Sequence, residues 1–227
     1  MDRKEIKADA KSLIGGSNWI LMSLAMIIGS FIVAIPIAIA TTIMGALSLV
    51  VQKAAERGDP ILVTASTILL VAYFVFYIIV CLGLYGCLFI SMFWNALDVW
   101  YGNSPDLIKT AKCIKYTFAG AGMVWGLMWR MYIPIYGIIA PFRFAQQFFI
   151  KSDHPHMKAK FCRKASARIM KGYKMDYFIF TLSFFPWMLL MFVTCGLASF
   201  WVTPYMYVSM AGYYDCLKQA NGGEVWS

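Results

Sequence analysis

Two uncharged apolar runs constrain this chain more than any other feature of its sequence. They extend from Trp19 to Val51 and from Ile61 to Leu97, and neither contains Asp, Glu, Lys or Arg. Each run is longer than the roughly 20 residues that an α-helix needs to cross a bilayer. The whole chain is 61% hydrophobic and 14% charged, whereas ordinary soluble domains carry about 25% charged residues. We therefore expect an all-α, polytopic integral membrane protein.

Three basic segments fix the expected topology. Residues 1–17, 102–116 and 151–176 contain four, three and eight Lys or Arg residues, and each has the periodicity of an amphipathic helix. Lys and Arg in short loops favour the cytoplasmic side. One crossing between residues 116 and 150 would separate the second and third basic segments, whereas two crossings keep both inside. The turn between these crossings is expected near Arg130, where aromatic residues, Pro134 and Gly137 cluster.

The chain is thus expected to form one membrane domain, residues 1–227, with about six transmembrane helices in three hairpins. A basic amphipathic interfacial helix precedes each hairpin, and both termini are cytoplasmic. The parts are an interfacial helix at 1–17, hairpins at 18–100 and 102–150, a basic loop with a third hairpin at 151–217, and a tail at 218–227. The apolar stretch within 116–150 is short for two spans, so two full spans and a re-entrant hairpin both remain open.

A weak internal repeat accompanies this arrangement. The returning legs of the second and third hairpins carry Pro-Phe-Arg-Phe from Pro141 and Pro-Tyr-Met-Tyr from Pro204. Each is followed by an aromatic pair, Phe148-Phe149 and Tyr213-Tyr214. Repeats recur in transporter folds, but they also arise in folds with no transport role.

Few polar residues lie in the expected spans. Arg130 has two interpretations, an interfacial side chain or an arginine that lines a substrate path. Arg143 and Gln147 are four residues apart, which places them on one helix face just after Pro141. This face is the place where we would expect a bound anionic group or lipid.

The basic segment from Lys158 to Lys174 is expected to lie on the inner leaflet. Phe161, Ala165 and Ile169 recur every four residues, and this apolar stripe is expected to face the acyl chains. The opposite side would contact anionic headgroups through Arg163, Lys164, Arg168, Lys171 and Lys174.

No catalytic motif is present, and neither a cofactor nor a metal is expected. The two histidines, His154 and His156, have only Asp153 and the distant Cys162 as possible co-ligands, which favours a solvated loop over a zinc site. The net charge of +9 is attributed to loops beside the membrane, so anionic lipid headgroups and other membrane proteins are the expected partners, and nucleic acid is not.

The sequence also resembles the bacterial integral membrane family named domain of unknown function 975. Its N-terminal motifs stand here as Glu5-Ile6-Lys7, Ala10-Lys11, Leu13 and Gly16-Ser17-Asn18-Trp19. Its C-terminal block stands as Ser166, Met170–Lys174, Leu182-Ser183-Phe184, Trp187, Trp201–Tyr205 and Tyr213-Tyr214. The chain departs from the family at the middle turn, which usually reads Pro-Gly-Ile and here reads Pro134-Ile135-Tyr136-Gly137. The resemblance implies an integral membrane fold and a location in the bacterial cytoplasmic membrane, and it adds no mechanism.

These patterns predict a non-catalytic inner-membrane accessory, scaffold or envelope component. The alternative is a transporter or permease subunit for a small or amphipathic molecule. An intramembrane enzyme is disfavoured because no acid, base or nucleophile set can be assigned.

Overall fold

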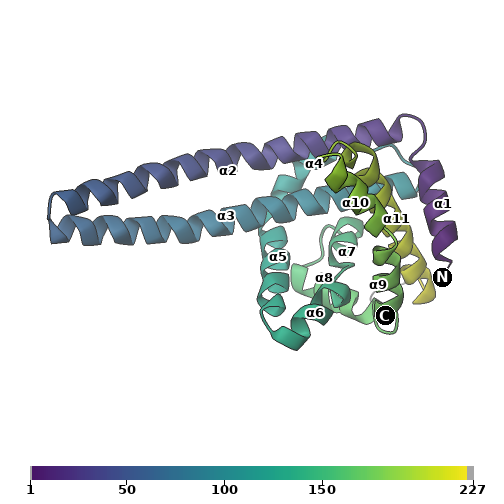
Figure 1. Ribbon diagram of the computed structural model, residues 1–227. Helices are drawn as coiled ribbons and strands as arrows, with labels where there is room; N and C mark the ends of the chain where they lie inside the picture. Colours follow the sequence, from purple (N-terminus) through teal and green to yellow (C-terminus); the bar gives the residue numbers. More distant parts are fainter. Residues whose placement is uncertain (1, 224–227) are drawn as a thin grey trace.

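The protein is described by a computed structural model that covers residues 2–223, with side chains at all of these except 113, 134–136 and 138. Over this range the chain forms helices joined by turns and contains no strand. Two long helices project from a bundle built by the shorter ones (Figure 1). The expected all-α class is confirmed for the described part of the chain.

The projecting element is an antiparallel hairpin of α2 (Asn18–Glu56) and α3 (Pro60–Trp100). Its tip turns at Gly58, whose φ of 67° suits a residue without a Cβ. The Asp59 carboxylate then accepts hydrogen bonds from the backbone N–H groups of Ile61 and Leu62, at 3.0 and 3.3 Å, which caps α3. Pro60 occupies the first turn, where its missing N–H costs nothing.

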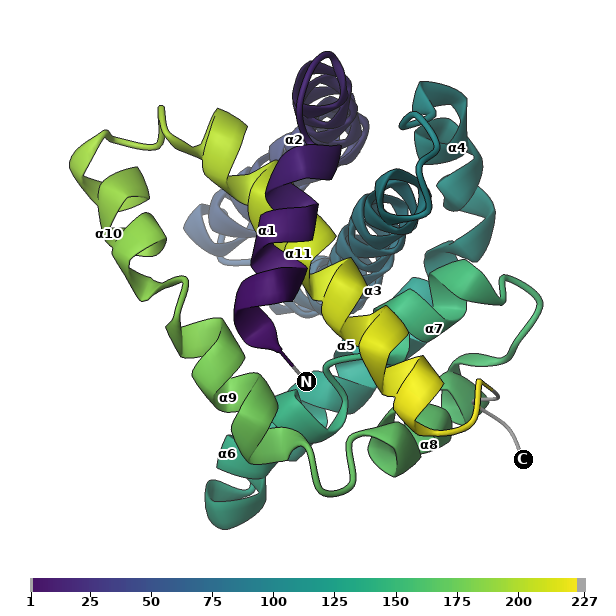
Figure 2. The same ribbon diagram turned by 90° about the vertical axis from the view of Figure 1, so that its right-hand side faces the viewer.

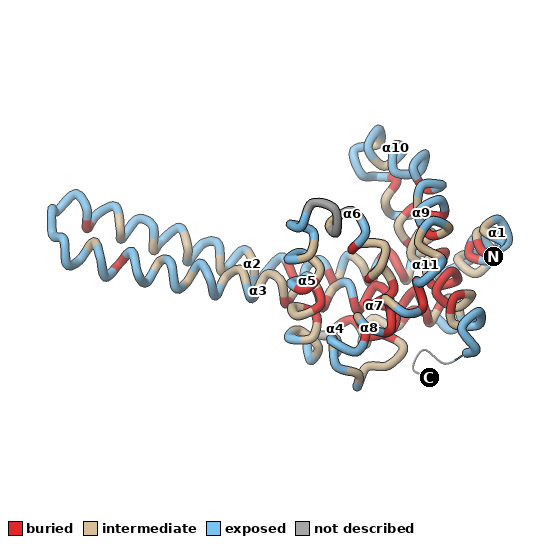
Figure 3. The backbone as a smooth tube through the Cα atoms, turned by 90° about the horizontal axis from the view of Figure 1, so that it is seen from below, coloured by how far each residue is buried: buried red, intermediate tan, exposed pale blue. Residues whose placement is uncertain are grey.

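Most residues in the outer half of this hairpin are exposed (Figure 3), and many of them are apolar. Ile35 and Ile39 on α2 and Phe76 on α3 are each more than half exposed. Helices of 39 and 41 residues extend about 60 Å at 1.5 Å per residue, twice the thickness of a hydrocarbon core. An apolar surface of this extent favours a lipid environment, because moving apolar groups from water into lipid lowers their free energy.

The bundle is built by the remaining helices of the described residues, which are shorter than those of the hairpin. They are α1 (Arg3–Leu13), α4 (Leu107–Lys112), the 3-10 helix η1 (Cys113–Tyr116), α5 (Thr117–Met131), α6 (Pro134–Arg143), α7 (Gln147–Asp153), α8 (Ala159–Ile169), α9 (Lys174–Leu182), α10 (Phe185–Val193) and α11 (Ser199–Ala220). The expected turn near Arg130 is confirmed, because α5 ends at Met131. A further turn lies near Cys195, between the end of α10 at Val193 and the start of α11 at Ser199.

Three segments of the described chain are long and apolar enough to cross a membrane. They are α2, α3 and residues 174–193. The last of these segments consists of α9 followed directly by α10. In the middle hairpin, α5 has 15 residues and α6 has 10, and each falls short of the roughly 20 needed for a full crossing. The arrangement of six spans therefore stays a prediction, and the lengths of α5 and α6 favour a re-entrant middle hairpin.

Helices α3 and α5 cross at a pair of glycines. A Cβ built on Gly86 would lie 2.3 Å from the carbonyl carbon of Gly120, and one built on Gly120 would lie 2.6 Å from that of Gly86. Small residues of this kind let two helix backbones approach closely in a membrane. This contact fixes α5 against the inner half of the hairpin.

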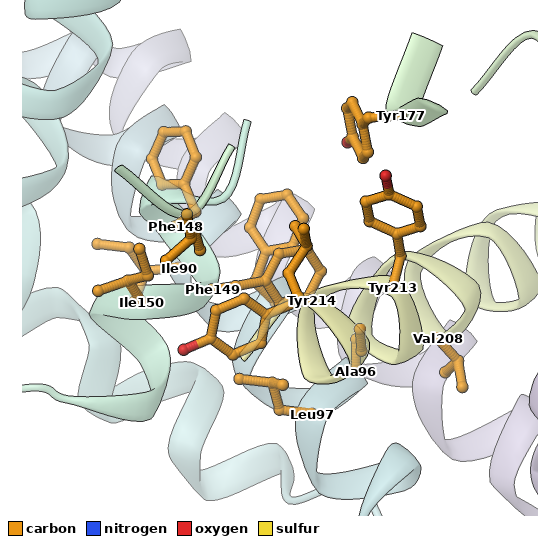
Figure 4. Close-up of a cluster of buried hydrophobic side chains, with 14 of the residues drawn as sticks. Ile90, Ala96, Leu97, Phe148, Phe149, Ile150, Tyr177, Val208, Tyr213 and Tyr214 are labelled. Carbon is orange, nitrogen blue, oxygen red and sulfur yellow. The ribbon is translucent and has the colours of Figure 1, made fainter. Parts of the chain in front are cut away.

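The centre of the bundle is aromatic, and three returning helices build it (Figure 4). Phe93 of α3 lies 4.4 Å from Phe149 of α7 and 5.2 Å from Tyr207 of α11, measured between ring centroids. Phe149 in turn stacks on Tyr214 at 5.5 Å. Tyr213 and Tyr214 are fully buried, and their hydroxyl groups donate to Asp176 and Asp153 at 2.9 and 3.1 Å.

The amphipathic helices pack on the helices around this centre. Helix α4 packs on α2 and α3, α8 packs on α7 and α5, and α1 packs on α11 (Figure 2). The internal repeat seen in the sequence has a partial counterpart in this packing, since α4 and α8 each pack on the hairpin that precedes them. Helix α1 instead packs on α11, a helix far from it in the sequence.

Candidate anion-binding site

A basic cavity of about 420 Å³ is lined by residues of α5, α6 and α8 and by Phe144, which directly follows α6. The three helices are labelled in Figures 1 and 2. The cavity lining includes five cationic side chains and one phenyl ring, namely Arg130, Arg143, Lys160, Arg163, Lys164 and Phe144. Two separate groups of residues that the sequence singled out, Arg130 with Arg143 and the pair Arg163-Lys164, are therefore brought together in space.

Helix α8 supplies three of these cations because of its periodicity. Cys162, Ala165 and Ile169 are buried against the bundle, so residues on the opposite face, Lys160 and Lys164, reach the cavity and the surface. The apolar stripe is expected to face lipid acyl chains. This expectation is wrong for Ala165 and Ile169, which are buried where α8 packs on α7 and α5. Only Phe161 of the stripe is exposed.

Two guanidinium groups lie against the backbone of Gly126 in α5. A Cβ at this position would lie 1.5 Å from Nη1 and 2.6 Å from Cζ of Arg163. The Arg163 guanidinium therefore occupies the space that any side chain at position 126 would fill. Arg130, one turn further along α5, donates from Nη1 to the Gly126 carbonyl. Gly126 thus positions Arg163 through its missing side chain and Arg130 through its carbonyl oxygen.

The guanidinium groups of two arginines lie close to the phenyl ring of Phe144. The Cζ atoms of Arg130 and Arg143 lie 5.4 and 5.7 Å from the centroid of the Phe144 ring. Cations within about 6 Å of an aromatic face are attracted by its quadrupole, by about 0.5–2 kcal/mol depending on exposure. Phe144 is itself buried, so it orders both guanidinium groups at the side of the cavity.

Ser166 ties α8 to the break between α6 and α7. Its hydroxyl donates to the carbonyl oxygen of Arg143 at 3.1 Å and accepts from the backbone N–H of Gln146 at 3.2 Å. Both groups stand at the interruption of the helix, where intrahelical partners are missing. This fully buried serine thereby fixes the backbone of Arg143 relative to the cations of α8.

Arg130 and Arg163 lie in the cavity without a paired carboxylate among the described residues. Elsewhere cations meet carboxylates, as Lys109 does with Asp98 at 2.6 Å and Lys218 with Asp153 at 2.9 Å. Within residues 2–223, no carboxylate forms an ion pair with Arg130 or Arg163. Burial, and next the nearby charge of Arg130, lower the pKa of Arg163. A bound anion would relieve both effects.

The other residues expected at a site lie elsewhere. Arg143 is the last residue of α6 and Gln147 the first of α7, so the expected continuous helix face does not exist. Gln147 is fully buried, and its side-chain amide has no hydrogen-bond partner among the described residues. Arg168, Lys171 and Lys174 do not line the cavity, and the last two lie beyond the end of α8.

The sequence does not single out three members of the site. Lys160 could have been found, because it lies three and four residues before the pair Arg163-Lys164 and so shares their helix face. Gly126 and Phe144 carry no such signal, since a glycine in an apolar helix and a phenylalanine among apolar residues most often serve helix packing alone.

The lining residues can bind charge but offer no general base. They present guanidinium and ammonium groups, a phenyl ring and the methyl group of Ala167. Among the described residues, no three His, Cys, Asp or Glu side chains are grouped as metal ligands. His154 lies 3.4 Å from Asp153, a carboxylate that already accepts from Tyr214 and Lys218.

The cavity falls inside a segment that a known family describes. Residues 119–221 match the family model for protein of unknown function, DUF975. This is the family that the sequence motifs indicated. The match runs from the third residue of α5 to just past the end of α11 and includes every residue of the basic cavity, whereas the long hairpin of α2 and α3 lies outside it. No curated protein and no solved structure matches the chain significantly.

Proposed function

We propose that this protein is a non-catalytic component of the bacterial cytoplasmic membrane that holds anionic lipid headgroups in its basic cavity. An accessory, scaffold or envelope role follows from such binding, because a held lipid ties the bundle to one leaflet and to neighbouring proteins. The observation that carries the proposal is the convergence of five cations from α5, α6 and α8, with no carboxylate of residues 2–223 paired to Arg130 or Arg163.

The proposed topology places α1, α4 and α8 at the cytoplasmic face, together with both termini. The basic residues of these three helices are the reason, since short cytoplasmic loops are enriched in Lys and Arg. Reporter fusions after Asp59 and Gly196 should report the outside, and fusions after Ser104 and Met157 the inside. An outside signal after Met157 would place α8 on the wrong face and refute this arrangement.

Lipid retention tests the binding itself. The full chain, purified in a neutral detergent, should retain anionic phosphatidylglycerol in preference to zwitterionic phosphatidylcholine, as measured by native mass spectrometry. The preference should weaken with salt, because exposed charges are screened. The double change of Arg130 and Arg163 to Gln should abolish it.

A matched control removes the same charge from the tip of the hairpin. Lys53→Gln with Arg57→Gln lowers the net charge equally and lies far along the hairpin from the bundle (Figure 1). This control should keep the lipid preference. Equal retention of both lipids by the unchanged protein, or equal loss in the control, would count against the proposal.

A transport role is the second candidate, and the break between α6 and α7 favours it. Helices interrupted beside a charged cavity are a common arrangement in secondary transporters, and Arg143 stands at such an interruption. A flux assay in sealed vesicles separates the two roles. Saturable efflux of an anionic solute that disappears with Arg143→Gln would favour the transporter, and binding without flux would favour the lipid-holding component.

A further inference from the structure

We infer that the cavity is selective for a terminal phosphate group with two negative charges, and that Gly126 determines this selectivity by seating Arg163. The inference rests on the proposed lipid-binding function and names the headgroup class. A lipid phosphomonoester, such as phosphatidic acid, belongs to this class. The phosphodiester of phosphatidylglycerol, with a single charge, does not.

The charge of the site is the first reason. Arg130 and Arg163 both lie at Gly126, and Arg143 shares the Phe144 ring with Arg130. A phosphodiester neutralises only one of the two charges of Arg130 and Arg163, neither of which has a carboxylate partner among the described residues. A terminal phosphate carries about 1.5 to 2 negative charges near pH 7, because its second pKa is about 6. The larger anionic charge therefore matches the site better.

The geometry of the donors is the second reason. Guanidinium groups bind phosphate oxygens through two parallel N–H donors, and each such pair needs two free oxygens. A terminal phosphate offers three unesterified oxygens, whereas a phosphodiester offers two. The arginines come from three different helices, α5, α6 and α8. Two guanidinium groups that each bind two oxygens would have to share both oxygens of a phosphodiester. On a terminal phosphate they need to share only one of the three free oxygens.

The position of Arg163 is the third reason. Its guanidinium lies against the backbone of Gly126, where an added Cβ would come within 1.5 Å of Nη1. Gly126→Ala must therefore displace this guanidinium while leaving every charge of the cavity in the protein. Gly122 lies four residues earlier on the same helix, and a Cβ there would meet nothing within 4 Å. Gly122→Ala is accordingly a matched control.

The test compares lipids that differ in the phosphate ester. The full chain in neutral detergent would be titrated with phosphatidic acid and with phosphatidylglycerol of identical acyl chains, and lipid-bound species counted by native mass spectrometry. We expect at least a tenfold preference for phosphatidic acid, retained in Gly122→Ala and reduced to less than threefold in Gly126→Ala. Inorganic pyrophosphate, added as a competitor, shows whether the phosphate alone suffices or the lipid chains are needed.

Each outcome bears on a different statement. Equal binding of the two lipids by the unchanged protein overturns the selectivity but leaves the proposed lipid binding in place. Binding of neither lipid above phosphatidylcholine overturns both. An unchanged preference in Gly126→Ala refutes the role of Gly126. If that variant fails to fold, Arg163→Lys keeps the charge and removes the fork, and full selectivity in this variant would refute the role of Arg163.

Discussion

The crossing of α3 and α5 predicts that Gly120→Ala destabilises the protein. A Cβ on Gly120 would lie 2.6 Å from the carbonyl carbon of Gly86 and 2.9 Å from the backbone nitrogen of Cys87. Ordinary van der Waals contacts to a Cβ begin at about 3.4 Å. The two backbones must therefore separate by several tenths of an ångström, because neither contact atom belongs to a flexible side chain.

The expected cost follows from two opposing effects. Overpacking of this kind costs about 1–3 kcal/mol, while replacement of glycine by alanine inside a helix contributes up to about 1 kcal/mol in the other direction. Gly122→Ala on the same helix has only the favourable effect, since its added methyl group meets no atom within 4 Å. The difference between the two variants should therefore be about 1–3 kcal/mol.

Thermal unfolding in detergent, followed by circular dichroism or by exposure of buried cysteines, measures this difference. In a chain of this size 1 kcal/mol corresponds to roughly 2–4 °C, so Gly120→Ala should melt roughly 2–12 °C below Gly122→Ala. Equal melting temperatures would show that α3 and α5 do not cross at these glycines. The packing of α5, and with it the position of Arg130, would then have to be reconsidered.

Three further results are expected. Ser166→Ala removes two hydrogen bonds at the break between α6 and α7, so it should lower the unfolding free energy by about 1–3 kcal/mol, and a stability unchanged within error would contradict the described clamp. Tyr214→Phe leaves the Asp153 carboxylate with one donor fewer and should cost about 1.5–3 kcal/mol, measured by chemical denaturation. Burial raises the pKa of Cys162 to about 11, so at pH 8 only about one thiol in a thousand is ionised. Iodoacetamide should modify the exposed Cys195 first, and the modification of Cys162 should rise with pH up to about 11; equal rates at pH 8 would refute this.

The sequence predicts the long hairpin well, because its signal is local. The uncharged runs from Trp19 to Val51 and from Ile61 to Leu97 are each long enough to cross a bilayer as an α-helix, and the Gly58-Asp59-Pro60 turn combines a left-handed residue, an N-cap and a first-turn proline in consecutive positions. The turn at Cys195 follows from the same kind of reasoning, since the apolar stretch from Tyr177 to Leu217 is too long for a single span.

The bundle is less predictable because its contacts join residues far apart in the chain. Periodicity places Cys162 and Ile169 on one face of α8 but does not say whether protein or lipid covers that face. Likewise, the four-residue spacing of Arg143 and Gln147 predicts a shared face only if the helix is continuous, and the interruption after Pro141 removes that premise. The sequence marks Pro141 as a potential break, but it does not indicate where the chain goes after it.

The basic cavity shows the same limit. Arg130 and Arg163 can each be recognised as unusual, one as a charge in an apolar run and the other as part of a basic segment. Their meeting at Gly126 depends on how α8 packs across α5, which no pattern within either helix encodes. Interhelical distances of this kind follow only from the full set of packing contacts.

The packing of α1 on α11 has a consequence for biogenesis. The ribosome makes α1 before α11, yet Ile6 and Ala10 of α1 are buried in the folded bundle, where α1 packs on α11. The apolar face of α1 therefore reaches its folded environment only after α11 has been synthesised. A chain truncated before α11 would leave α1 without this packing partner.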